Sequence, residues 1–174
     1  MRQLWVLDKN YVNPIGESIY NDLTVSSSLS DLQDNSLKNT LAKINSNPTH
    51  KNFINELRAS GTKLKYQINS NLNTPGSFNP FTNTIQFRSA SDINYNTVLE
   101  EFFHAYQHYK VGIGKYMTSP FKGRSNIEFE AKLYHDITCL VSSPASGCTF
   151  LGGISNEYSN WLMEITEDWT RYPS

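Results

Sequence analysis

A single helical segment, residues 95–110, constrains this chain more than any other part of its sequence. On a wheel of about 100° per residue, four ionisable side chains share an arc about 100° wide: Glu100, Glu101, His104 and His108. Large apolar side chains fill the rest of the wheel: Val98, Leu99, Phe102, Phe103, Ala105, Tyr106 and Tyr109. The sequence therefore predicts a helix over about 94–110 whose chemically active groups gather on one side.

An ordinary solvated face is the simplest interpretation of that arc, but its composition argues against it. Solvated helix faces usually mix Lys with Glu at i,i+4, and residues 93–109 contain no Lys or Arg. Glu100 and His104 are four residues apart, so their side chains point to a common spot that a tetrahedral metal can accept. Glu101 leans to the side, where it could reach a metal-bound water. His104 and His108 form a second pair with the same spacing.

The remaining patterns predict an α+β domain that spans residues 1–174. Periodicity and turn signals place helices at about 29–45, 48–57, 125–141 and 154–170, and strands at 63–68 and 84–88. Because helices precede and follow the two strands, we expect a small antiparallel sheet packed with several helices. Gly112 and Gly114 are expected to end the central helix.

Two of the predicted helices carry specific burial expectations. The first should bury a stripe formed by Leu29, Leu32, Leu37, Leu41 and Ile44. The second should bury Phe53, Ile54 and Leu57, with His50 exposed near its start.

Composition excludes several classes of partner. The net charge is -1 and no run of basic residues occurs, which argues against binding to nucleic acid or to an anionic membrane. No apolar stretch approaches the roughly 20 residues needed to span a bilayer, and the first residues lack the apolar region of a signal peptide. Localisation stays open. Cys139 and Cys148 are interpreted as free thiols, with a local disulfide as the alternative.

Three segments in order resemble the gluzincin class of zincin metallopeptidases. TVLEEFFHAYQHY at 97–109 resembles the bacterial form of the HExxH motif, HELxHAxQ, with its first His changed to give EExxH. FNPFTNTIQF at 78–87 is similar to the strand and turn that run along the substrate cleft. IEFEAKLYHD at 127–136 is similar to the downstream helix that supplies a glutamate as third ligand.

The resemblance implies a zincin-like fold and a Zn²⁺-dependent peptidase acting on a peptide or protein substrate. Glu100 stands in place of the first metal-binding His, His104 matches the second, and Glu101 matches the general base. The third ligand would be Glu128 or Glu130.

Two further features bear on that assignment. The small residue Ala131 favours Glu128 as third ligand, whereas Lys132 occupies the place of an Asp or Asn that supports a metal-binding His. Two anionic ligands make the metal a weaker Lewis acid, so we expect slow hydrolysis or none. His108, Tyr134, His135 and Tyr158 are candidates for the group that stabilises the oxyanion.

Three other interpretations remain open. A zincin-like domain without activity could bind a peptide or partner protein, with residues 84–88 as its edge strand. A binuclear-iron bundle could use Glu101 and His104 as a Glu-x-x-His pair, although no second copy occurs. The Glu/His face could also be incidental to a purely structural domain.

Overall fold

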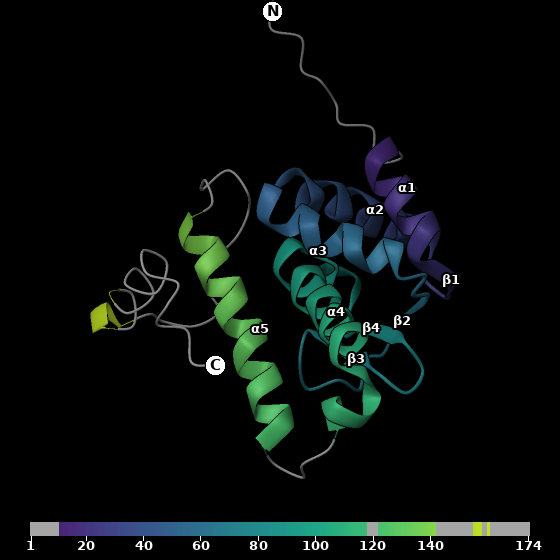
Figure 1. Ribbon diagram of the computed structural model, residues 1–174. Coiled ribbons are helices and arrows are strands. Elements are labelled where there is room, and N and C mark those ends of the chain that lie inside the picture. The colour runs from purple at the N-terminus through teal and green to yellow at the C-terminus, as the bar shows by residue number, and fades with distance from the viewer. Residues whose placement is uncertain (1–10, 118–121, 142–154, 158–159, 161–174) are drawn as a thin grey trace, which may run out of the picture.

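The computed structural model describes residues 11–117, 122–141, 155–157 and 160 (Figure 1). Almost all of the helix predicted at 154–170 lies outside these residues, as do Tyr158 and Cys148. The described part has an α+β architecture, as predicted. None of its helices is both long and apolar enough to cross a bilayer.

Three capped helices open the described chain: α1 (Pro14–Leu23), α2 (Asp31–Ser46) and α3 (Pro48–Ala59). The side chain of Asn13 caps α1, Ser30 and Gln33 form a capping box on α2, and Asn47 caps α3. Helix α1 was not predicted from the sequence. It packs so closely on α2 that a Cβ added at Gly16 would lie 1.8 Å from the Lys38 carbonyl oxygen.

The sheet contains four strands in the order β1-β2-β4-β3: β1 (Thr24–Ser27), β2 (Leu64–Ile68), β3 (Gly76–Asn79) and β4 (Thr84–Phe87). Strand β2 runs parallel to β1 and to β4, and only β3 is antiparallel to its neighbour. The sheet is therefore mixed and the prediction of an antiparallel sheet is wrong: the two predicted strands, β2 and β4, are parallel because the unrecognised strand β3 lies between them in the chain and pairs antiparallel with β4. The predicted edge strand is also wrong: β4 is internal, and β3 lies at the edge.

Helix α4 (Tyr95–Met117) follows a short 3-10 turn (Ala90–Asp92) and contacts α2, α3, α5 and β3. Its residues Val98, Leu99 and Phe102 are completely buried. Gly112 has a positive φ of 72°, which interrupts the helix where the sequence predicted its end. Helix α5 (Lys122–Val141) runs alongside α4 (Figure 1).

Three local expectations need correction. Leu32 is 60% exposed, whereas the other four residues of its predicted stripe are buried. His50 was expected at the surface but is completely buried, because Tyr134 of α5 closes over it with a hydroxyl 2.8 Å from Nδ1. The burial of Phe53, Ile54 and Leu57 is confirmed. Cys139 is disulfide-bonded, so its interpretation as a free thiol is wrong.

Candidate metal centre

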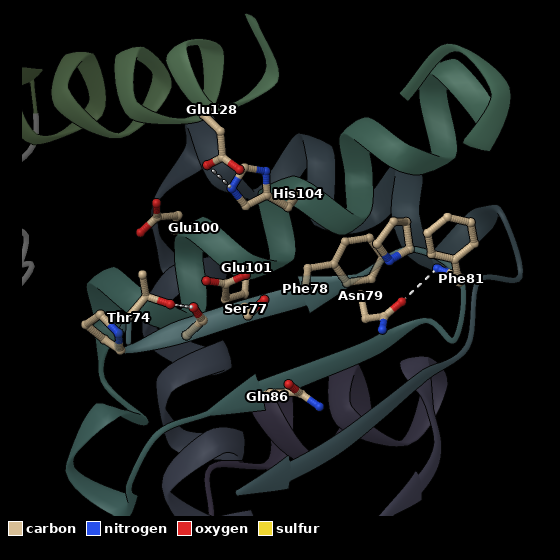
Figure 2. Close-up of a pocket in the computed structure, with 13 residues that line it drawn as sticks. Thr74, Ser77, Phe78, Asn79, Phe81, Gln86, Glu100, Glu101, His104 and Glu128 are labelled. Carbon is tan, nitrogen blue, oxygen red and sulfur yellow. Dashed lines mark hydrogen bonds and ion pairs between the residues drawn. The ribbon is translucent and has the colours of Figure 1, made fainter. Parts of the chain in front are cut away.

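Three predicted ligands meet between α4 and α5. Glu100 and His104 lie one turn apart on α4, and Glu128 reaches them from α5 (Figure 2). One donor atom from each residue lies within 4.8 Å of the other two. His104 is 5% exposed, and its Nε2 lies 3.4 Å from Glu128 Oε2. This set of one imidazole and two carboxylates could hold a metal ion.

Glu101 occupies a confined position beside the cluster, between α4 and strand β3. Its carboxylate accepts a hydrogen bond from the Phe78 backbone N–H, and its side chain is buried. The second oxygen, Oε2, has no hydrogen-bond partner among the described residues. A Cβ at Gly76 would lie 2.7 Å from Glu101 Oε1 and 2.6 Å from the Thr97 methyl carbon. Only glycine therefore fits at this point of β3 without displacing the carboxylate.

Charge in the cluster is unbalanced towards the negative. Burial raises the pKa of Glu101 to about 8, opposed by the charge of His104 and reinforced by Glu100 and Glu128. Burial acts to lower the pKa of His104, but hydrogen bonding to Glu128 and the charges of Glu101, Glu128 and Glu100 raise it overall. The Glu101 shift comes mainly from burial, whereas the His104 shift shows that the carboxylates around this imidazole favour a bound proton or another cation at this place.

A cavity of about 430 Å³ opens beside the three predicted ligands. Residues 74–81 and Gln86 form its walls together with Glu100, Glu101, His104 and Glu128. None of the described residues that line it is Lys or Arg. Phe78, Pro80 and Phe81 make one wall apolar, and Phe81 is 68% exposed at its mouth. The cavity thus combines an acidic end with an apolar end.

The edge of β3 that is not paired with β4 faces helix α4. Arg88 N donates to the Pro75 carbonyl at 2.9 Å, so the next residue, Gly76, directs its backbone groups away from β4. By the same alternation the backbone groups of Phe78 also point away from β4, and its N–H donates to the Glu101 carboxylate. Figure 2 shows β3 passing directly beneath the side chains of α4.

A buried amide, Gln107, was not singled out from the sequence. Its Oε1 lies 3.0 Å from His104 Nδ1, while its Nε2 donates to the Ile127 carbonyl at 3.2 Å and to Glu130 Oε2 at 2.8 Å. Glu130 therefore contacts Gln107, and Glu128 is the glutamate beside His104. On the wheel, Gln107 falls about 20° from Glu100, which is the signal that could have identified it.

The other predicted site residues lie away from the cavity walls. The His108 ring is half-buried with its centroid 5.8 Å from that of Phe78, and burial lowers its pKa. Tyr134 stacks on Phe103 at 4.2 Å and bonds to His50. His135 is buried with Nε2 3.2 Å from Asn96 Oδ1. Tyr134 and His135 thus lie in the packing between helices.

Lys132, at the second departure from the family pattern, lies on the exposed side of α5. Its ammonium group is 3.0 Å from the buried carboxylate of Asp136. A lysine side chain has donors only, so it cannot accept a hydrogen bond from a histidine ring. Lys132 therefore cannot provide the support that the resemblance places at this position.

No family model, curated protein or solved structure matches this chain. A fold by itself assigns no function, because one fold can carry many chemistries. Functional inference therefore starts from the residues around the cavity.

Proposed function

We propose that this chain is a metal-dependent peptide hydrolase in which Glu100, His104 and Glu128 hold Zn²⁺. One observation carries the proposal: the three donor atoms converge at the acidic end of a cavity, beside the buried carboxylate of Glu101. That arrangement has a metal-ligand set, a base and space for a substrate at one place.

The donor spacing fits a metal better than it fits a direct ion pair. Charge-assisted N–H···O bonds are usually about 2.7–2.9 Å long, whereas His104 Nε2 and Glu128 Oε2 are 3.4 Å apart. Two ligands at about 2.0–2.1 Å from a tetrahedral zinc lie about 3.4 Å from each other. The orphaned Oε2 of Glu101 and the surplus of carboxylates add independent support for a cation here.

When bound, the metal would supply Lewis-acid polarisation of the scissile carbonyl and of a water. The chain supplies the proton transfers. The Glu101 carboxylate accepts a hydrogen bond from the Phe78 N–H, and its Oε2 has no partner among the described residues. Oε2 can therefore take a proton from a water in the cavity. It can then return that proton to the departing amine nitrogen. Gly76 leaves the space in which the carboxylate sits.

A peptide is the substrate class that suits the cavity walls. An extended chain can add to the edge of a sheet through backbone hydrogen bonds, and β3 is an edge strand of the described sheet, with its Phe78 N–H already bonded to Glu101 and its Gly76 carbonyl to Thr74. The apolar wall formed by Phe78, Pro80 and Phe81 would receive a substrate side chain. In chain order, β3 and β4 precede the helix α4 that carries Glu100 and His104, and α5 with Glu128 follows it, which is the order that the resemblance implies.

The experiment is a hydrolysis assay on mixed peptides, followed by mass spectrometry of the products. We expect slow cleavage, because two anionic ligands weaken the Lewis acid relative to a two-histidine site. A chelator should stop cleavage and added Zn²⁺ should restore it. If the chain binds peptides but neither cleaves them nor holds a metal, it is a binding module, and the proposal is contradicted.

A further inference from the structure

Gln107 has a fixed orientation in the structure. Both of its contacts through Nε2 are to groups that can only accept, the Ile127 carbonyl and the Glu130 carboxylate. A flipped amide would direct its oxygen at both acceptors and its nitrogen at His104. The network therefore assigns Oε1 to the side of His104 Nδ1, 3.0 Å away.

This orientation determines which nitrogen of His104 carries the proton. A carbonyl oxygen only accepts, so Nδ1 must donate to Gln107 Oε1. In the neutral ring the other nitrogen, Nε2, then has a bare lone pair. That lone pair faces the Glu128 carboxylate at 3.4 Å, an arrangement that is repulsive unless Nε2 gains a second proton, which gives the cationic ring that hydrogen-bonds to Glu128, or a metal ion lies between the two.

We propose that Gln107 is a positioning residue, held by Glu130, that fixes the Nδ1–H tautomer of His104 and so presents Nε2 to a metal. The inference rests on the proposed metal site. It gives this chain a substitute for the support that the zincin pattern supplies from the position of Lys132, whose ammonium group pairs with Asp136. Metal-binding histidines generally donate their second N–H to a carbonyl, carboxylate or water, and this bond sets the ring orientation.

The hydrogen bonds of Gln107 to His104, Ile127 and Glu130 also compensate for the burial of its amide. Gln107 is buried, so its amide would destabilise the fold if its hydrogen bonds were missing. Glu130 is exposed but fixes one end of that amide from α5, as does the Ile127 carbonyl one turn earlier. Both contacts from α5 thus act on His104 through a residue of α4.

The first test reads the tautomer directly in the metal-free wild-type protein. ¹⁵N-detected NMR of the imidazole nitrogens distinguishes a protonated Nδ1 from a protonated Nε2. Variants in which one histidine at a time is replaced assign the signals of the four histidines of the chain. At a pH where the ring is neutral, we expect His104 to carry its proton on Nδ1 only. A proton on Nε2, or a mixture of tautomers, would overturn the inference without any variant being required.

The second test measures zinc affinity by competition with a chromophoric chelator. Gln107→Leu keeps the approximate side-chain volume and removes the hydrogen bonds, and it should weaken binding about 10–100-fold. Glu130→Ala should weaken it less, because the Ile127 carbonyl still holds the amide. Gln67→Leu on β2 is the matched control and should bind zinc as wild type does.

The two proposals can fail separately. If wild type binds zinc and a folded Gln107→Leu variant binds it equally well, the positioning role is wrong and the metal site stands. If wild type binds no metal but shows the Nδ1–H tautomer, which Gln107→Leu abolishes, the positioning role stands and the proposed function is wrong. Circular dichroism of each variant identifies any loss of fold.

Discussion

Two buried histidines, His104 on α4 and His50 on α3, show what distinguishes a site from a core. His104 lies among Glu100, Glu101 and Glu128, and these carboxylates raise its pKa despite burial. His50 lies against the rings of Phe53, Tyr95 and Tyr134, and burial lowers its pKa to about 4, with a further contribution from the charge of His135.

The comparison teaches that burial alone does not mark chemistry. Both imidazoles are almost inaccessible to solvent and both have a hydrogen bond at Nδ1, to Gln107 in one case and to the Tyr134 hydroxyl in the other. The difference is the surplus of negative charge beside a cavity. Apolar surroundings keep a histidine neutral, whereas acidic surroundings attract a cation to it.

The largest expected effect is on catalysis. Glu101→Gln should lower kcat/KM for peptide cleavage by about 10²–10⁴-fold, because the amide cannot take a proton from water. Zinc binding and the melting temperature should change little. Glu17→Gln on α1, a surface glutamate paired with Lys38, is the control for loss of one carboxylate. Retention of full activity in Glu101→Gln would exclude it as the base.

The next effect concerns the core histidine and acid stability. The pKa of His50 is about 4 in the fold against 6.5 as its ordinary value, so protonation favours the unfolded chain. The contribution of His50 to the free energy of unfolding is complete above about pH 6.5 and falls as the pH drops towards 4. The total loss is about 3 kcal/mol. Urea unfolding at several pH values measures the loss. In His50→Phe the free energy of unfolding should change less with pH over this range. An unchanged slope would show that His50 is not responsible.

A smaller effect is expected on the wall of the acidic cavity. Gly76→Ala would place a methyl group against Glu101 and Thr97, and such overpacking typically costs about 1–3 kcal/mol. Cleavage should also fall, since the base has to move. Gly61→Ala is the control: that glycine has a positive φ of 73° with nothing within 4 Å, so alanine should destabilise the chain while leaving cleavage per folded molecule intact. Equal cleavage in both variants would argue against the placement of Glu101 by β3.

Much of this site could be predicted because helical periodicity alone brings Glu100, Glu101 and His104 together. Their juxtaposition depends on one helix, and the helix is specified by apolar residues in its own segment. Glu128 required the family resemblance, since its position depends on how α5 packs on α4. The hydrogen bonds that orient the His104 ring were not predictable, because they need Gln107 of α4 and Glu130 of α5 to face each other across two helices.

The missed elements have physical explanations as well. Strand β3 lies within a segment rich in Asn, Pro and Gly, which reads as a turn, and its pairing with β4 outweighs those preferences. The burial of His50 depends on Tyr134, 84 residues later in the chain. In both cases a contact with another element, a neighbouring strand for β3 and a distant helix for His50, decides the outcome, whereas local sequence favours the opposite.

The most direct test of the central claim is native mass spectrometry of the protein purified without chelators and supplied with Zn²⁺. We predict one zinc per chain, bound by wild type and by His108→Ala, and lost in His104→Ala. His108 is the matched control because it lies on the same helix, four residues further along and outside the three-residue cluster. A wild-type chain without bound zinc, or a His104→Ala variant that binds as much as wild type, would contradict the account.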